Sequence, residues 1–130
     1  TRLCLNEIDG IDCEGKTVLD VGCGSGILMT AMLLMGAGDA TGCDIEENAM
    51  TATAENMALN NIDQEKWTTV LGDLLSDENV RSTIAAKAPF DLIVANIVAD
   101  VLMHMLPYLK LQRHRNIFIH CGLVRMCTVH

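Results

Sequence analysis

The residues with the clearest chemical potential stand in one stretch, Asp20 to Ile27, which reads DVGCGSGI. Gly22, Gly24 and Gly26 occupy alternate positions there, between two apolar runs. Glycine accepts a positive φ and lets the main chain approach a ligand closely, and the start of a following helix offers unpaired N–H groups. The stretch therefore predicts a binding loop for a ligand that lies against the backbone.

The spacing of the glycines separates the ligand classes that use such loops. A Walker loop ends in Gly-Lys-Ser/Thr, which does not occur here. The dinucleotide fingerprint G-x-G-x-x-G, counted from Gly22, requires a third glycine where this chain has Ile27. The observed spacing, G-x-G-x-G with Asp20 two residues ahead, resembles the first motif of Rossmann-like S-adenosylmethionine methyltransferases. The cofactor of those enzymes has no pyrophosphate, so its methionine part and ribose need only pass close to the main chain.

Three aspartates are predicted to bind the same cofactor, together with Gly22 and Gly24. Asp20 can meet an ammonium group directly or through water; the alternative is a carboxylate that caps the loop or faces a helix dipole. Asp44 ends a predicted strand, where a carboxylate can accept hydrogen bonds from both ribose hydroxyls. Asp73 follows the next predicted strand, where an acid can face the adenine amino group or cap the following helix.

The elements that position these residues alternate between short β-branched runs and longer helical stretches, which is typical of a parallel sheet covered by helices. Strands are predicted at residues 17–21, 40–44, 67–71, 90–95 and 116–120, and helices at 25–35, 46–60, 77–86 and 98–109. In the second helix, Met50, Ala54, Met57 and Asn61 recur at helical spacing. The near-continuous apolar run at 90–95 indicates a strand buried on both faces.

Right-handed crossovers then predict an α/β, Rossmann-like doubly wound sheet, mostly parallel, in the order 3-2-1-4-5. The switch point lies between the first and fourth strands. A ligand is therefore expected across the carboxyl ends of those strands, beside the glycine loop and Ala95–Ile97.

Length and charge limit the possible functions. A chain of 130 residues suits a single domain with one core, and because it opens on Thr1 we expect a fragment. Residues 1–103 hold all 17 acidic residues, whereas residues 104–130 hold none. This acidic body argues against direct nucleic-acid binding and is compatible with a basic protein partner, a small cation or no partner. No membrane span or signal peptide is predicted.

The six cysteines do not predict a disulfide framework. Cys4, Cys23 and Cys43 lie in apolar helix or strand patterns, where a free thiol behaves as a small hydrophobe. This usage favours a reducing, cytoplasmic compartment. Two further cysteines lie near histidines at the carboxyl end, but no CxxC pair occurs and the spacing fits no standard zinc finger, so no metal site is predicted.

The fourth predicted strand continues into a more specific signal. The stretch Phe90–Asp100 reads FDLIVANIVAD and, taken with Thr1–Leu5 (TRLCL) and the Gly22 loop, it resembles bacterial ribosomal protein methyltransferases of the PrmA type over residues 1 to about 109. The resemblance implies a truncated class I methyltransferase fold, S-adenosyl-L-methionine as cofactor and methylation of amino groups of large-subunit ribosomal protein eleven. It also implies cofactor contacts from the positions of Thr1, Gly22, Asp44 and Asn96. Thr1 is otherwise an N-cap for a helix predicted at residues 3–8.

Asn96 is the predicted catalytic residue. An attacking amine must be neutral, and a free lysine has a pKa of about 10.4, so the site must desolvate the amine or accept its proton. The side-chain oxygen of Asn96 could accept a hydrogen bond from the amine and aim its lone pair, although it cannot act as a base. Asp100 is a second helper or a partner of the helix dipole. Adenine-modifying relatives carry Pro-Pro-aromatic after their asparagine, whereas Ile97 follows here, which disfavours base methylation.

The chain also departs from the family pattern. The amino-terminal substrate-recognition domain and a Gly-Thr-His loop do not precede Thr1, and Lys110–Arg115 (KLQRHR) replaces a Lys-Pro-Gly-Gly turn. The last two strands of the sheet are expected to be missing. The alternatives that stay open are a small-molecule methyltransferase, a NAD-binding oxidoreductase and a non-catalytic module that binds the cofactor.

Overall fold

A computed structural model of the chain describes residues 10–95, 97, 99–111, 113–121 and 124–129. In chain order its elements are β1 (Thr17–Val21), α2 (Ile27–Leu34), β2 (Asp39–Asp44), α3 (Glu47–Leu59), the 3-10 helix η1 (Gln64–Lys66), β3 (Trp67–Leu71), α4 (Glu78–Ala85), β4 (Phe90–Ala95), α5 (Ala99–Leu111), β5 (Arg113–Cys121) and β6 (Val124–Val129). Each strand and helix predicted from residue 17 onward is confirmed, with ends displaced by at most three residues. The helix predicted at residues 3–8 lies outside the described residues.

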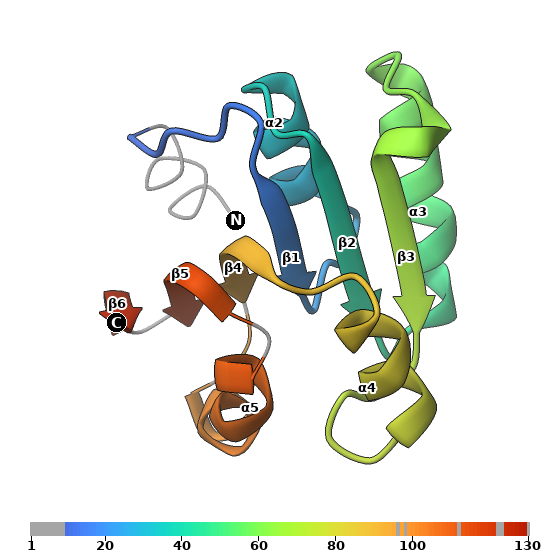
Figure 1. The fold of residues 1–130 in the computed structure, drawn as a ribbon. Coiled ribbons are helices and arrows are strands. Elements are labelled where there is room, and N and C mark those ends of the chain that lie inside the picture. Colours follow the sequence, from blue (N-terminus) through green and yellow to red (C-terminus); the bar gives the residue numbers. More distant parts are fainter. Residues whose placement is uncertain (1–9, 96, 98, 112, 122–123, 130) are drawn as a thin grey trace.

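The strands form one sheet in the order β3-β2-β1-β4-β5-β6, which confirms the predicted order of the first five (Figure 1). These five run parallel, and β6 is antiparallel to β5. The sixth strand is a correction, because no strand was predicted after residue 120. The missed signal is the pair Gly122-Leu123 between two β-rich runs, a spacing typical of a hairpin.

Each face of the sheet carries its own apolar cluster. Leu28, Met29 and Met32 of α2 and Met57 of α3 belong to the cluster on one face. Val80 and Ile84 of α4 and Met105 of α5 belong to the cluster on the other. The two pairs of helices therefore cover opposite faces, as expected for a doubly wound sheet (Figure 1).

The strand β4 contributes to both clusters. Leu92 and Val94 pack in the cluster of α2 and α3, whereas Ile93 and Ala95 pack in the cluster of α4 and α5. Successive side chains of a strand point to opposite faces, so a strand covered on both sides is apolar at nearly every position. The predicted burial of residues 90–95 on both faces is confirmed.

The glycine loop delays the start of α2. The helix was expected from Ser25 but begins at Ile27, because Gly24 and Gly26 adopt the left-handed conformation with φ of 54° and 75°. Gly26 is the N-cap residue, and no side chain caps the helix. The amino end of α2 is therefore not capped by a side chain of the loop.

Of the four residues predicted at helical spacing on α3, Met57 is buried and Met50 packs against the core, whereas Ala54 and Asn61 are exposed. The buried residues of α3 are Ala49, Thr53 and Met57. The physical reason for the difference lies in Thr53, whose hydroxyl donates to the carbonyl oxygen of Gly24 at 3.1 Å and so can be buried without loss. A polar residue that is satisfied in this way does not register as apolar in a periodicity count.

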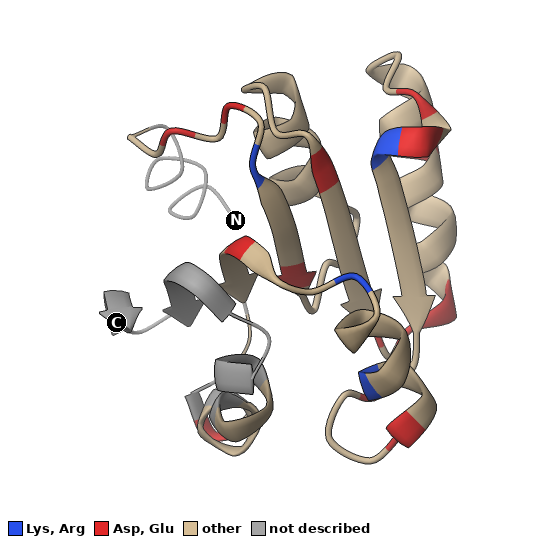
Figure 2. Cartoon of the chain, viewed as in Figure 1, with Lys and Arg blue, Asp and Glu red and all other residues tan. Residues whose placement is uncertain are grey.

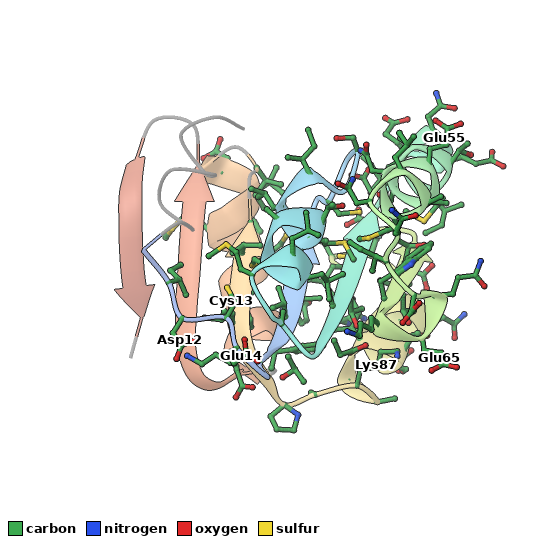
Figure 3. All side chains as sticks on the ribbon, turned by 90° about the horizontal axis from the view of Figure 1, so that it is seen from above. Asp12, Cys13, Glu14, Glu55, Glu65 and Lys87 are labelled. Atoms are coloured by element: carbon green, nitrogen blue, oxygen red, sulfur yellow. The ribbon has the colours of Figure 1, made fainter. Side chains whose placement is uncertain are left out.

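Acidic residues outnumber basic residues in the described part of the chain. Figure 2 shows that the acidic residues lie on several elements rather than in one patch. In Figure 3 the acidic side chains of Glu55 and Glu65 point outward at the α3 side of the molecule. Within the described part of the chain, no helix has the length and apolar character needed to cross a membrane.

Candidate functional site

A cavity of about 490 Å³ opens at the carboxyl edge of the sheet. Gly22, Asp44 and Asp73 line it from the ends of β1, β2 and β3, and Ile97 and Val101 line it from the segment after β4 and from α5. Its volume falls within the range of roughly 300–1,000 Å³ that is usual for small-molecule sites. The cavity therefore lies where the topology predicted a ligand, beside the switch point.

The carboxylate of Asp44 is held in place by two backbone amides. Its Oδ2 accepts a hydrogen bond from Gly24 N at 2.8 Å, and its Oδ1 accepts one from Glu46 N at 2.9 Å. Each carboxylate oxygen has a further lone pair that can accept from a ligand. Asp44 thus joins the end of β2 to the glycine loop and presents a fixed negative charge to the cavity.

The first residues of the glycine loop are tied to β2. Gly22 N and Cys23 N both donate to the carbonyl oxygen of Cys43, at 2.8 and 3.0 Å. Gly22 has a φ of 74°, and a Cβ added there would lie 2.7 Å from Cγ2 of Ile97. The absence of a side chain at this position is therefore required both by the backbone and by the segment after β4.

Two side chains of α3 hold the rest of the loop. Thr53 Oγ1 donates to Gly24 O at 3.1 Å, and Asn56 Nδ2 donates to Ser25 O at 2.6 Å. These residues were not predicted as part of the site. The available signal was weak, since it consists only of two polar residues three positions apart on an otherwise ordinary helix.

Asp20 is buried on β1 with 1% of its surface exposed. Neither of its carboxylate oxygens has a hydrogen-bond partner among the described residues. Burial and, to a smaller extent, the nearby charge of Asp44 raise the pKa of Asp20 to about 7. Asp20 does not line the cavity itself, but it directly precedes Val21, which does.

The loop-capping alternative for Asp20 is wrong, because neither of its oxygens accepts a hydrogen bond from the loop among the described residues. An unpaired buried carboxylate is costly and is a frequent mark of a functional site. Asp20 is therefore a candidate for contact with a bound molecule that carries a donor or a positive charge.

Asp73 lines the cavity at the end of β3. Its Oδ1 accepts from Leu75 N at 2.9 Å and its Oδ2 from the hydroxyl of Ser76 at 3.2 Å. The alternative role as cap of the next helix is wrong, since the N-cap of α4 is Asp77, which accepts from the amides of the first turn. Asp73 instead organises the turn after β3.

The buried cysteines at the site are free thiols. Burial raises the pKa of both Cys23 and Cys43 to about 12, so both stay protonated at neutral pH. A protonated thiol is a poor nucleophile and a poor metal ligand. The expected role of these two residues as small hydrophobes is confirmed, while Cys4 lies outside the described residues.

Two predicted site residues, Thr1 and Asn96, lie outside the described residues. Asp100 is exposed in the first turn of α5 and does not line the cavity. Among the described residues, no group of three or more His, Cys, Asp or Glu side chains could hold a metal ion. Five predicted residues, Asp20, Gly22, Gly24, Asp44 and Asp73, thus lie together at the carboxyl edge of β1, β2 and β3.

Comparisons with known proteins place the chain in a family. The family described as "Ribosomal protein L11 methyltransferase (PrmA)" matches residues 1–127. The ribosomal protein L11 methyltransferase of Agathobacter rectalis is 39% identical over 111 residues, and that of Nitrosomonas europaea is 44% identical over 111 residues. These alignments cover 82% and 84% of this chain, respectively, and 34% of each relative, so the chain spans about a third of their length.

Among solved structures, the ribosomal protein L11 methylase of Lactobacillus delbrueckii subsp. bulgaricus is similar with a TM-score of 0.75 and 34% identity. The similarity covers 91% of this chain and 57% of that one. The predicted family resemblance is confirmed: the chain belongs to the ribosomal protein L11 methyltransferase (PrmA) family.

Proposed function

We propose that this chain is the S-adenosyl-L-methionine-binding domain of an enzyme that transfers a methyl group to amino groups of a protein. The observation that carries the proposal is the carboxylate of Asp44, fixed by the amides of Gly24 and Glu46 between the glycine loop and the cavity. A carboxylate at the end of the second strand suits the two hydroxyls of a ribose. The G-x-G-x-G spacing favours a cofactor without a pyrophosphate.

The residues at the cavity fit the remaining groups of this cofactor. The bare backbone at Gly22 lets a ligand approach the main chain, and Asp73 can accept a hydrogen bond from the amino group of adenine. Asp20 offers a negative charge for the ammonium group. When bound, the cofactor supplies a methyl group activated by a positively charged sulfur. The acidic groups at this edge therefore match a ligand that carries two positive charges on its methionine part.

The protein's part in the reaction is to align and desolvate the acceptor. Holding two reactants in line can supply several kcal/mol, on the order of 7–11 in the best cases. The family resemblance assigns Asn96 to orient the acceptor amine and Thr1 to contact the cofactor. A lysine side chain or an amino terminus would reach the site past the acidic groups around the cavity, whose charge attracts a cation.

A basic ribosomal protein is the proposed acceptor. Support comes from the names of the relatives and from the excess of acidic over basic residues in the described part of the chain (Figure 2). The proposed location is the cytoplasm, where a ribosomal protein is available and the free thiols of Cys23 and Cys43 stay reduced. In this proposal the domain makes no direct contact with nucleic acid or membrane.

Calorimetric titration of the chain with S-adenosylhomocysteine and, separately, with NAD tests the cofactor. We expect saturable binding of S-adenosylhomocysteine alone. Asp44→Ala should weaken it by about tenfold or more, because hydrogen bonds to a charged group are lost. Glu55→Ala is the matched control, since it removes an equal charge from the exposed face of α3 (Figure 3).

Binding of NAD alone would overturn the proposal in favour of an oxidoreductase. If the cofactor binds, transfer of labelled methyl groups by the chain to a purified basic ribosomal protein tests the acceptor. Transfer to a small amine but not to the protein would indicate a small-molecule methyltransferase, and transfer to neither would indicate a binding module.

A further inference from the structure

Arg81, on α4, makes contacts that no part of the proposed function yet uses. Its Nη1 donates to the carbonyl oxygens of Leu74 and Leu75, both at 3.0 Å. Leu74 and Leu75 belong to the turn after β3 and line the cavity. Arg81 does not line the cavity, so it holds this wall from behind.

The same guanidinium contacts a second wall. Its central carbon lies 4.9 Å from the centroid of the ring of Tyr108 on α5, the geometry of a cation–π contact. Val101 and Met105, at earlier turns of α5, line the cavity. Arg81 therefore connects the turn after β3 to the helix that closes the opposite side.

The turn held by Arg81 also carries Asp73. Asp73 Oδ1 accepts from Leu75 N, while Arg81 binds the carbonyl oxygen of the same residue. The peptide groups at Leu75 are thus fixed at both ends. A displacement of this turn would move the Asp73 carboxylate with it.

Arg81 is half-buried, and its hydrogen bonds go to main-chain oxygens. Within the described residues it forms no ion pair with a carboxylate, although acidic residues are abundant (Figure 2). Both of its side-chain hydrogen bonds go instead to carbonyl oxygens of the cavity wall. A planar group with several donors can bind two carbonyls and stack on a ring at once, which a lysine cannot do.

We propose that Arg81 is a positioning residue for the base end of the cavity, which fixes the turn at Leu74 and Leu75 against α5 and so sets Asp73 to recognise the amino group of a purine. The inference rests on the proposed cofactor and adds a determinant of base selectivity. Loss of Arg81 should weaken recognition of the 6-amino group more than it weakens binding of the rest of the ligand.

The selectivity is measured by calorimetry with S-adenosylhomocysteine and with S-inosylhomocysteine, in which an oxo group replaces the 6-amino group. The unchanged chain should prefer the adenine compound. Arg81→Gln should weaken binding of the adenine compound by about tenfold, because the Asp73 carboxylate is no longer held in position to accept from the 6-amino group. The preference for the adenine compound should then largely disappear. Lys87→Gln is the control, because it removes an equal charge from an exposed residue just after α4 (Figure 3).

Hydrogen exchange on the ligand-free protein gives a second readout that needs no cofactor. Arg81→Gln should speed amide exchange at residues 72–76 while exchange in β1 and β2 stays unchanged. Arg81→Lys should restore part of the protection and part of the preference. A uniform rise in exchange with an unchanged base preference would mean that Arg81 only stabilises the fold, and would overturn the inference.

If Arg81→Gln does not fold, Tyr108→Leu keeps the hydrogen bonds of Arg81 and removes only the ring. It should speed amide exchange at residues 72–76 and reduce the base preference by a smaller factor; a base preference in this variant equal to that of the unchanged chain would also overturn the inference. Failure of the unchanged chain to bind S-adenosylhomocysteine refutes the proposed function. The role of Arg81 is tested separately, by comparing the base preference of each variant with that of the unchanged chain.

Discussion

At the scale of single residues, the site contains two carboxylates in opposite situations. Asp44 accepts two backbone amides, whereas Asp20 is buried and neither oxygen has a partner among the described residues. The first arrangement pre-aligns a charge for a ligand, and the second leaves a charge that a ligand can satisfy. A buried acid that is costly to the fold is best explained by what it binds.

Asp20→Asn should make stability less sensitive to pH. A carboxyl with a raised pKa supports folding while it is protonated; this contribution is complete below the unfolded value of about 3.8 and is lost as the pH rises to about 7. The shift corresponds to roughly 4 kcal/mol. In urea unfolding at pH 4, 6 and 8, the free energy of unfolding of the variant should rise relative to that of the unchanged chain as the pH increases. Glu55→Gln is the control.

If Asp20 meets the ammonium group as proposed, the same variant should bind S-adenosylhomocysteine more weakly at pH 8, because a neutral amide replaces the negative charge. Higher stability together with lower affinity is the expected signature of a functional residue. A parallel loss of stability at every pH would contradict this account of Asp20.

Gly22→Ala should reduce ligand binding beyond what backbone strain explains. Its Cβ would meet Ile97 at 2.7 Å and displace the segment after β4. Gly15→Ala is the matched control, since Gly15 has a similar φ of 68° but no atom within 4 Å of an added Cβ. Both variants should lose about 1 kcal/mol of stability, and only Gly22→Ala should also lose affinity for S-adenosylhomocysteine. Equal affinities would indicate strain alone.

At the scale of elements, α3 acts as the support of the glycine loop. Thr53→Val keeps the shape of the side chain but leaves the half-buried carbonyl of Gly24 without its donor, at a cost of about 1 kcal/mol. Affinity for S-adenosylhomocysteine should fall with it, because the loop loses one of its restraints. Thr83→Val is the control, since Thr83 is exposed on α4 and bonds only within its own helix. A loss of stability without any loss of affinity would exclude the supporting role.

Some of these features could be predicted from the sequence and others could not. The strand order was predictable because crossover handedness leaves few topologies, and Asp44 was predictable because it ends a strand beside a glycine loop. Thr53 and Arg81 were not, because bonds from side chains to loop carbonyls leave no periodic pattern. Asp73 and Asp77 both precede α4, and only the residue at which the helix begins decides which of them caps it.

At the scale of the whole molecule, the cavity draws its walls from segments that are distant in sequence: the ends of three strands, Ile97 and α5. A ligand that fills the cavity is therefore expected to restrain these segments together. Saturation with S-adenosylhomocysteine at one hundred times its Kd should stabilise the chain by about 2.7 kcal/mol.

This stabilisation should be visible in two independent measurements. For a chain of this size we expect the thermal midpoint to rise by roughly 10 °C, and NAD at the same concentration should leave it unchanged. Hydrogen exchange should slow together at residues 22–24, 44–46 and 72–75 and in the first turns of α5, with little change at the amino ends of the strands. Protection confined to one of these segments would mean that the ligand does not bridge the carboxyl edge.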